Sequence, residues 1–374
     1  MQKRRRKRRS RWLFFVLLFL ILVLGILLLL RAGVILCGAQ SDRCTLPLPQ
    51  PTEAQVPLPS PPPTFVPPSP SLPPSPSPSP SPTPAPPREV DFAVEAIPDA
   101  FYQEAEERGF IQEVSLEVHN IDAPEEIFNR DMEIYCPPGY SEAEKYDVLI
   151  LIHGGAGSYH AFTLEKHEAN TGVWFAFRDL YDNMIREDLC KPLIVVSIGS
   201  TSYYPSLGGT WDVSFDQFAD DLRTAVLPYL AEHFATFAAS GEETDLQNAR
   251  EHFGIGGISN GSLFAINSGM TRCFDLFGNY IALSGNSHPG EAAQAINSDA
   301  WKDLPITCFY AGSGWEDNQQ FNSLNGYQEI RNSTSRLQEG KNCFYLDVDG
   351  KHNYAAWVIH IYNALQVAFR RQLF

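Results

Sequence analysis

The sequence lacks the cysteine spacing of a metal-binding protein. Its seven cysteines form no CxxC pair and stand at no Cys/His ligand spacing, which argues against a zinc site. Because the count is odd, at least one thiol is free or paired between chains. Cys308 and Cys343 each fall in a predicted strand, and a disulfide between them is one interpretation. We favour the other, in which two buried thiols pack as small apolar groups.

Acidic residues are absent before Asp42, and basic residues are concentrated there. Nine of the 28 lysines and arginines precede Asp42, eight of them between Lys3 and Arg11. The rest of the chain therefore holds 19 basic and 44 acidic residues, a net charge of −25. A domain this acidic repels nucleic acid and other anionic polymers, which argues against nucleic-acid binding. An uncharged partner is more compatible with this net charge than an anionic partner is.

No charge interrupts residues 12–30, which read WLFFVLLFLILVLGILLLL. As a helix this run spans roughly 28 Å, which matches the hydrocarbon core of a bilayer. The basic cluster in residues 1–11 predicts, through the positive-inside rule, a cytoplasmic N-terminus and an extracytoplasmic chain after Arg31. We therefore predict a single-pass protein of the cell membrane with a transmembrane signal anchor at residues 12–30. A signal peptide cleaved near Cys37 and Ala39 is the alternative.

Proline makes up about half of the stretch from Thr45 to Pro87. Proline fixes φ and removes hydrogen-bond donors, so this stretch should form an extended polyproline-II spacer, on the order of 100 Å when stretched. We interpret residues 31–88 as a Pro/Ser-rich extracytoplasmic linker, and favour a tether with no specific partner over an SH3-type ligand. Residues 89–374 are then the globular domain.

After Arg88, short apolar β-branched runs alternate with amphipathic segments. The predicted strands are Ile111–His119, Asp131–Tyr135, Asp147–Ile152, Leu193–Ile198, Phe253–Ile258, Tyr280–Ser284, Ile306–Ala311 and Cys343–Val348. The predicted helices are Val173–Glu187, Phe215–Phe237, Gly261–Thr271, Gly326–Glu339 and Tyr354–Arg371. This alternation indicates an α/β fold with a mainly parallel central sheet and helices on both faces. The first two strands have no helix between them, which predicts an antiparallel edge.

The motif Gly-x-Ser-x-Gly ends a predicted strand at residues 257–261 (GISNG). A helix is predicted directly after Ser259. This motif at a strand-to-helix turn is typical of a nucleophile elbow, where glycines permit a tight turn that exposes the serine hydroxyl. The helix N-terminus then lies beside the negative charge that develops during acyl transfer. A glycine-rich corner needed only for packing is the alternative.

A second glycine-rich loop (HGGAG) follows the predicted strand at Asp147–Ile152. In an acyl-transfer enzyme such a loop gives one backbone N–H to the oxyanion hole, and the N–H of Asn260 would be the second donor. No Lys-Ser/Thr pair follows the loop, which excludes a Walker-type phosphate site. We expect His153 to be a structural hydrogen-bonding residue rather than a catalyst.

The general base should be a histidine that follows the serine and lies at the same edge of the sheet. Among nine histidines, His352 fits because it stands between a predicted strand, with its Asp-Gly-Lys turn, and an amphipathic helix. We favour it over His288, which also follows a strand, and expect His360 to be a packing or surface residue. The acid should follow the preceding strand, where Glu316 and Asp317 are adjacent. Spacing alone does not separate them, and either could orient the imidazole.

Six blocks of the chain resemble the "putative esterase" group of α/β-hydrolases, which includes feruloyl esterases, acetylxylan esterases and esterase D. The blocks, which cover most of residues 110–370, are CPPGYSEAEKYDVLILIHGG, LYDNMIREDLCKPLIVVSIG, DLRTAVLPYLAEHF, GGISNGSLFA, FYAGSGWED and DGKHNYAAWVIHIYNAL. The resemblance implies that Ser259 is the nucleophile, His352 the base and Asp317 the acid. It also implies backbone oxyanion donors at Gly155 and Asn260.

Two positions depart from that group. The residue after the serine is usually Met or another large apolar residue, whereas here it is Asn260, which predicts a more polar acyl pocket. The acid block is slightly stretched, which keeps Glu316 open as an alternative to Asp317.

These residues predict a serine carboxylic ester hydrolase that acts on feruloyl- or acetyl-type groups on carbohydrate through an acyl-enzyme. The reaction requires no metal and no organic cofactor, and the expected partners are the ester substrate and the membrane. The aromatic residues expected at the rim, which could stack on sugar rings, are Tyr159, Trp174, Trp211, Trp315 and Trp357. The alternatives are an acyltransferase of the mycolyltransferase type that acts on cell-wall glycans, and a non-catalytic surface binding protein on a hydrolase scaffold.

Overall fold

The structure, a computed structural model, describes residues 96–155, 157–204, 209–285 and 288–369. The predicted cytoplasmic segment, signal anchor and linker lie outside these ranges. Within them, no helix combines the length and the apolar character that crossing a bilayer requires.

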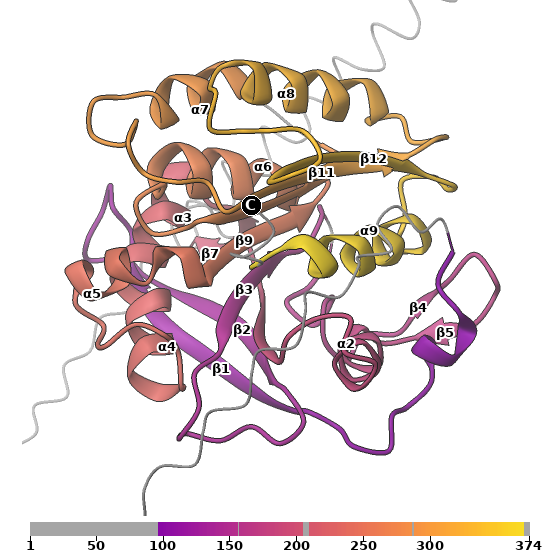
Figure 1. Cartoon of the computed structure of the whole chain (residues 1–374). Coiled ribbons are helices and arrows are strands. Elements are labelled where there is room, and N and C mark those ends of the chain that lie inside the picture. The colour runs from indigo at the N-terminus through magenta and orange to yellow at the C-terminus, as the bar shows by residue number, and fades with distance from the viewer. Residues whose placement is uncertain (1–95, 156, 205–208, 286–287, 370–374) are drawn as a thin grey trace, which may run out of the picture. The chain divides into compact units, whose positions relative to one another are not determined.

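An eight-stranded sheet lies at the centre of the domain (Figure 1). Its strands are β1 (Phe110–His119), β2 (Ile127–Cys136), β3 (Asp147–Ile152), β6 (Leu193–Ile198), β9 (Phe253–Ile258), β10 (Asn279–Leu283), β11 (Cys308–Gly314) and β12 (Cys343–Val348). Their spatial order is β1-β2-β6-β3-β9-β10-β11-β12. β2 runs antiparallel to both β1 and β6, and the other pairs run parallel. The predicted mainly parallel sheet and its antiparallel edge are therefore confirmed.

The central strands are buried on both faces. β3, β6 and β9 are buried at every residue, as expected of parallel strands that helices cover on both sides. Successive side chains of β3 point to opposite faces: Ile150 belongs to one apolar cluster, and Leu149 and Leu151 belong to the other. The domain thus has one core layer above the sheet and one below it.

Helices cover each face (Figure 1). One layer contains η1 (Asp99–Tyr102), α2 (Phe177–Arg186) and α9 (Tyr354–Val367). The other contains α3 (Phe215–Asp221), α4 (Leu227–His233), α5 (Glu243–Asn248), α6 (Asn260–Phe264), α7 (Pro289–Ile296) and α8 (Gln320–Asn332). The π-helical segments η2 (Leu222–Val226) and η4 (Ala265–Met270) continue α3 and α6, and a short 3-10 turn, η3 (Arg250–His252), precedes β9.

Two small hairpins follow the carboxyl ends of parallel strands. β4 (His167–Glu168) pairs with β5 (Trp174–Phe175) in the segment after β3. β7 (Thr201–Tyr204) pairs with β8 (Gly209–Asp212) in the segment after β6. Both hairpins therefore enter at the edge of the sheet where ligand sites form in open α/β folds.

Three predicted helices differ from the structure. The helix predicted at Val173–Glu187 begins only at Phe177, because Trp174–Phe175 form the strand β5. Instead of 326–339, α8 spans Gln320–Asn332, and Arg336 donates to backbone carbonyls within residues 296–304, which keeps the following segment in a loop. The helix after His352 is not amphipathic: every residue of α9 from Ala355 onwards is buried. A helix buried on all sides needs no polar face.

Cys136, Cys273, Cys308 and Cys343 are free thiols, and all four are buried. Cys343 pairs in register with Phe309, not with Cys308. The two thiols also belong to apolar clusters on opposite faces of the sheet. The favoured interpretation, two buried thiols that pack as apolar groups, is confirmed.

Candidate active site

Ser259 occupies a strained turn between β9 and α6. Its backbone has φ 52° and ψ −119°, a conformation that non-glycine residues rarely adopt and that occurs mostly at functional sites. The Ser259 N–H donates to Leu283 O at 2.8 Å, and the Ser259 carbonyl accepts the N–H of Ser262 at 3.1 Å. The predicted motif therefore has the strand–turn–helix geometry of a nucleophile elbow.

Both glycines of the motif are required by close backbone packing. A Cβ on Gly261 would overlap the carbonyl oxygen of Ile152, and a Cβ on Gly257 would overlap the backbone of Gly261. The elbow thus packs directly against the carboxyl end of β3. This packing brings the loop after β3 next to the serine, and a Cβ on Gly154 would lie only 3.3 Å from Ser259 Cβ.

The side chains of Ser259, His352 and Asp317 form one hydrogen-bonded chain. His352 Nε2 lies 2.8 Å from Ser259 Oγ, and His352 Nδ1 lies 2.9 and 3.1 Å from the two oxygens of Asp317. An ionised carboxylate accepts only, so His352 donates from Nδ1, and Nε2 of the neutral ring accepts the serine hydroxyl. This arrangement can take the proton from Ser259 as Oγ attacks a carbonyl carbon.

The three residues follow the carboxyl ends of β9, β11 and β12, so strands far apart in the chain meet at one sheet edge. Backbone hydrogen bonds also join the acid and base loops: Trp315 N–H donates to Val348 O at 2.8 Å, and Glu316 N–H donates to Gly350 O at 2.9 Å. These bonds fix the position of the acid relative to the base.

Asp317, and not Glu316, contacts the imidazole. The side chain of Asp317 is 0 % exposed, and its Oδ1 also accepts the N–H of Gln319 at 2.7 Å. Glu316 is 67 % exposed and lies 3.8 Å from Lys351 Nζ. The sequence spacing did not distinguish Glu316 from Asp317 as the acid. In the structure, Asp317 is the one of the two that contacts His352.

The ring of Trp357 packs against the imidazole of His352. The two rings meet edge to face at 5.1 Å between centroids, and Trp357 Nε1–H donates to Ser284 Oγ at 2.7 Å. Trp357 is only 6 % exposed, so it is not a rim residue. Its position five residues after His352, on the first turns of α9, gives it a bracing role that the sequence did not reveal.

The structure records other contacts for the remaining candidate histidines. The buried His153 donates from Nδ1 to Gly154 O at 2.6 Å, and burial lowers its pKa. His360 is buried in α9 with Nδ1 3.0 Å from Tyr310 OH, and burial lowers its pKa to about 4. His288 lies with its ring 6.4 Å from that of Phe215. His153 and His360 are packing residues, as expected.

The loop after β3 lies close to Ser259, since a Cβ on Gly154 would come within 3.3 Å of Ser259 Cβ. Gly157 N–H donates to Gly154 O at 3.0 Å. Gly155 is exposed in this loop, with open space around the position of a Cβ. Asn260 begins α6, where the first backbone N–H groups have no partner within the helix. Of the two predicted donor residues, Gly155 thus belongs to the loop next to Ser259, and Asn260 directly follows Ser259 in the chain.

The predicted rim aromatics differ in their exposure and in their contacts. Trp174 on β5 and Trp315 after β11 are each 60 % exposed. Tyr159 donates its hydroxyl to Glu113 at 2.6 Å and lies against the ring of His160. Trp211 belongs to β8, and its side chain lies outside the described part of the structure. Trp174 and Trp315 are thus the exposed flat surfaces near the acid and base loops.

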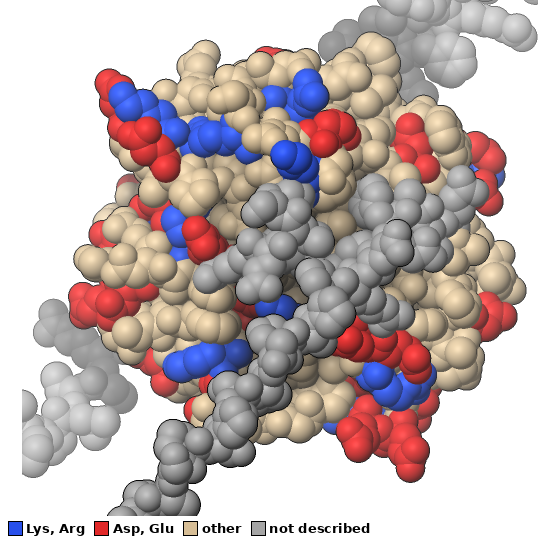
Figure 2. Space-filling view, in the orientation of Figure 1, with Lys and Arg blue, Asp and Glu red and all other residues tan. Residues whose placement is uncertain are grey.

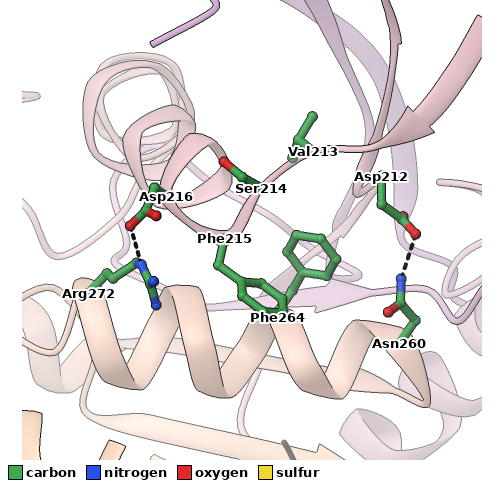
Figure 3. A pocket seen from close by; sticks show the side chains of 8 residues that line it. All are labelled: Asp212, Val213, Ser214, Phe215, Asp216, Asn260, Phe264 and Arg272. Carbon is green, nitrogen blue, oxygen red and sulfur yellow. Dashed lines mark hydrogen bonds and ion pairs between the residues drawn. The ribbon is translucent and has the colours of Figure 1, made fainter. Parts of the chain in front are cut away.

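A pocket of about 300 Å³ begins beside Asn260, the residue after Ser259. Figure 3 shows Phe215 and Phe264 between two polar ends, the Asp212–Asn260 pair and the Asp216–Arg272 pair. The lining residues are Asp212, Val213, Ser214, Phe215, Asp216, Asn260, Phe264 and Arg272. Apart from Asn260, none of them was singled out from the sequence, because their proximity arises only when the segment after β8 packs on α6.

A mainly parallel sheet with a serine elbow and a hydrogen-bonded Ser-His-Asp arrangement is typical of the α/β-hydrolase fold. The chain belongs to the family described as "Putative esterase", whose sequence model matches residues 126–367. Over 255 residues it is 25 % identical to endo-1,4-beta-xylanase Y of Acetivibrio thermocellus, a match that covers 64 % of this chain and 22 % of the xylanase. The chain therefore spans about a fifth of the length of that curated relative.

Solved structures show the same fold. A mutant of the feruloyl esterase module from Clostridium thermocellum, complexed with sinapinate, superposes with a TM-score of 0.62 at 22 % identity and covers 76 % of this chain and 97 % of the module. A ferulic acid esterase from the anaerobic fungus Anaeromyces mucronatus superposes with a TM-score of 0.55 at 17 % identity, covering 75 % of this chain and 98 % of the fungal one.

Proposed function

We propose that this chain is a membrane-anchored, extracytoplasmic esterase that removes feruloyl- or acetyl-type groups from carbohydrate, with Ser259, His352 and Asp317 as its catalytic triad. The observation that carries the proposal is the continuous chain of hydrogen bonds from Ser259 Oγ through the imidazole to the buried Asp317 carboxylate. Nucleophile, base and orienting acid must have this mutual geometry before an alcohol can attack an ester.

In the first half of the reaction, Ser259 Oγ bonds to the ester carbonyl carbon while His352 Nε2 takes the hydroxyl proton. The carbonyl oxygen becomes an oxyanion, which the backbone N–H groups of Gly155 and Asn260 stabilise. Each such donor contributes about 3–4 kcal/mol to the transition state. The C–O bond to the alcohol then breaks, and His352 returns its proton to the leaving oxygen.

In the second half, water replaces the alcohol. His352 takes a proton from the water, the resulting hydroxide bonds to the acyl carbon, and Ser259 Oγ leaves with the proton from the imidazole. Asp317 stays ionised throughout and stabilises the imidazolium that forms in each half. The products are the free acid and the alcohol, and the serine is restored.

A carbohydrate ester is supported by the relatives and by the charge of the chain. One relative is named a xylanase, and a similar structure is a feruloyl esterase module complexed with sinapinate. In Figure 2 acidic side chains gather at the lower right of the face shown, whereas basic ones gather at the top. A net-acidic domain meets a neutral polysaccharide without the repulsion that an anionic polymer would cause. Trp174 and Trp315 offer exposed rings for sugar stacking.

The catalytic proposal is tested with Ser259→Ala in the full-length chain. We expect the wild type to hydrolyse 4-nitrophenyl acetate and methyl ferulate, and the variant to lose about four to six orders of magnitude in kcat. A fluorophosphonate probe should label Ser259 in the wild type only. Equal turnover by the two proteins would refute the triad, and acylated sugar in place of free acid, with a sugar acceptor present, would show a transferase.

The anchor is a separate proposal and needs its own test. The full-length chain should stay in the membrane fraction after carbonate extraction, and a variant that lacks residues 1–30 should not. Protease added to intact cells should degrade the domain while a cytoplasmic marker protein stays intact. Protection of the domain in this assay would contradict an extracytoplasmic location, whatever the result with Ser259→Ala.

A further inference from the structure

The pocket beside Asn260 lies on the opposite side of Ser259 from the base. In the sheet, β9 carries the serine, while β11 and β12, which carry Asp317 and His352, lie on one side of it. The pocket residues 212–216 run from the last residue of β8 into α3, in the segment after β6, and β6 lies on the other side. In Figure 1, accordingly, α3 lies to the left of β9 and α9 to its right.

This placement assigns the pocket to the acyl group. His352 must reach the oxygen of the leaving alcohol in order to protonate it, so the alcohol lies toward β12. The acyl chain, which extends from the other side of the carbonyl carbon, then points toward β6 and into the pocket. Its volume of about 300 Å³ is at the lower end for small-molecule pockets, so the pocket limits the size of the acyl group.

The apolar walls of the pocket are already in place. Phe215 and Phe264 meet at 5.0 Å with their planes 72° apart. The carbonyl of Phe215 accepts a hydrogen bond from Ser268 Oγ at 2.9 Å, which ties the start of α3 to the π-helical segment η4. Such fixed walls bind a ligand without first having to be ordered.

The two acids of the pocket differ in their charge balance. Asp216 forms an ion pair with Arg272 at the far end. Asp212, at the end next to the serine, accepts from Ser200 Oγ at 3.0 Å and from Asn260 Nδ2 at 3.1 Å. Both of its partners are neutral, and among the described residues the structure records no ion pair of this carboxylate. A carboxylate has about four acceptor positions, so Asp212 can accept further hydrogen bonds from a ligand.

We infer that, among acyl groups that fit this pocket, Asp212 selects those that carry a hydroxyl or ammonium donor close to the ester carbonyl, and that it rejects those that carry a carboxylate there. The inference rests on the proposed role of Ser259. A donor on the acyl chain pairs with the carboxylate that no cation neutralises, whereas an acyl carboxylate meets a like charge. The hydrogen bond from Asn260 Nδ2 holds the Asp212 carboxylate at the end of the pocket next to Ser259. An apolar residue at position 260 could not donate this bond.

The test uses the full-length chain and 4-nitrophenyl esters that share one alcohol. The acyl groups are propanoyl, 3-hydroxypropanoyl, 3-aminopropanoyl and carboxyacetyl, and the spontaneous rate is subtracted. We expect kcat/KM of the wild type to be about tenfold or more higher for the two donor-bearing esters than for propanoyl, the change expected from one hydrogen bond to a charged group. The carboxyacetyl ester should be poorer than propanoyl by a similar factor.

Two variants separate charge from hydrogen bonding. Asp212→Asn keeps an acceptor oxygen but loses the charge, so the preference for 3-aminopropanoyl should disappear while part of that for 3-hydroxypropanoyl remains. Asp212→Ala should lose both. In both variants the carboxyacetyl ester should improve about tenfold relative to propanoyl. The control is Asp220→Asn, which makes the same change in net charge on α3 outside the pocket lining and should leave all ratios unchanged.

A merely structural role of Asp212 would lower activity on all four esters alike, and such a uniform loss would overturn the inference. So would a wild type with equal kcat/KM for propanoyl and both donor-bearing esters. These results are distinguishable from failure of the proposed function, in which no ester is hydrolysed and Ser259 is not labelled by fluorophosphonate. Labelling also reports whether each variant has a folded site.

Discussion

Asp317 and Glu316 are neighbours in the chain, but their carboxylates have opposite surroundings. Asp317 is fully buried and bonded to both the imidazole and the N–H of Gln319. Glu316 is in solvent beside Lys351, and an exposed ion pair of this kind contributes about 0–1 kcal/mol. The pair therefore offers a matched comparison at adjacent positions.

Asp317→Asn should lower kcat by about three to four orders of magnitude. The amide can donate to Nδ1, which favours the tautomer whose Nε2 carries the proton and cannot accept one from Ser259. Glu316→Gln should leave kcat within about twofold, since loss of an exposed charge costs little. The measurement is kcat on a good ester substrate at neutral pH. A large loss in Glu316→Gln with normal activity in Asp317→Asn would transfer the acid role to Glu316.

The sequence identifies a residue of the site only where a local sequence pattern surrounds that residue. Ser259 is found because its motif and the flanking elements occur together, and His352 because a strand, a turn and a helix frame it. Asp317 could not be separated from Glu316 by spacing, because the choice depends on which side chain turns inward. The contacts of Trp357 and Asp212 carry no local signal at all, since packing between distant segments creates them.

At the scale of elements, the junction of β9 and α6 is the part of the fold that tolerates least change. Gly261 packs so closely on Ile152 that no Cβ fits, whereas the Cβ position of Gly155 is open. Both glycines lie beside Ser259, and an alanine at either keeps the backbone N–H. The two positions differ mainly in the space that is available for a Cβ atom.

Gly261→Ala should destabilise the domain by several kcal/mol, because a Cβ against a buried carbonyl forces β3 and α6 apart; overpacking alone typically costs about 1–3 kcal/mol. Gly155→Ala should change stability by less than about 1 kcal/mol. Denaturant unfolding of the two variants measures the difference. Equal stability of both would mean that α6 can move away from β3 at little cost, contrary to the packing described above.

Four strands of the central sheet were predictable to the residue, but burial alone did not decide this, since the fully buried β10 and β11 have other bounds than predicted. β3, β6, β9 and β12 have the predicted bounds because continuous or alternating apolar runs end abruptly at polar residues. The bounds of α8 were wrong because hydrogen bonds of Arg336 to distant carbonyls decide where the chain leaves the helix. The hairpins β4–β5 and β7–β8 were missed, since strands of two to four residues leave no periodic pattern.

At the scale of the whole molecule, α9 is a helix buried on all sides, and His360 lies within it. The residue is completely buried, and burial lowers its pKa from 6.5 to about 4. Its neutral ring lies 3.0 Å from Tyr310 OH through Nδ1. Unfolding exposes the ring to water, where it takes up a proton at a much higher pH than in the folded domain.

The stability of the domain should therefore fall as pH falls from about 6.5 to about 4. In this window the unfolded state binds a proton at residue 360 and the folded state does not, so the free energy of unfolding decreases by about 1.4 kcal/mol per pH unit, about 3 kcal/mol in all. His360→Asn should remove this part of the slope, although the smaller side chain lowers stability at every pH.

Denaturant unfolding of the wild type and of His360→Asn at pH 7, 5.5 and 4.5 measures the two slopes. Burial also lowers the pKa of His153 and His167 and raises that of Asp182 and Asp221. These groups are present in both proteins, so their contributions cancel in the difference. A difference that does not change with pH would mean that His360 is protonated in the folded domain, and α9 would then have to open to water in mild acid.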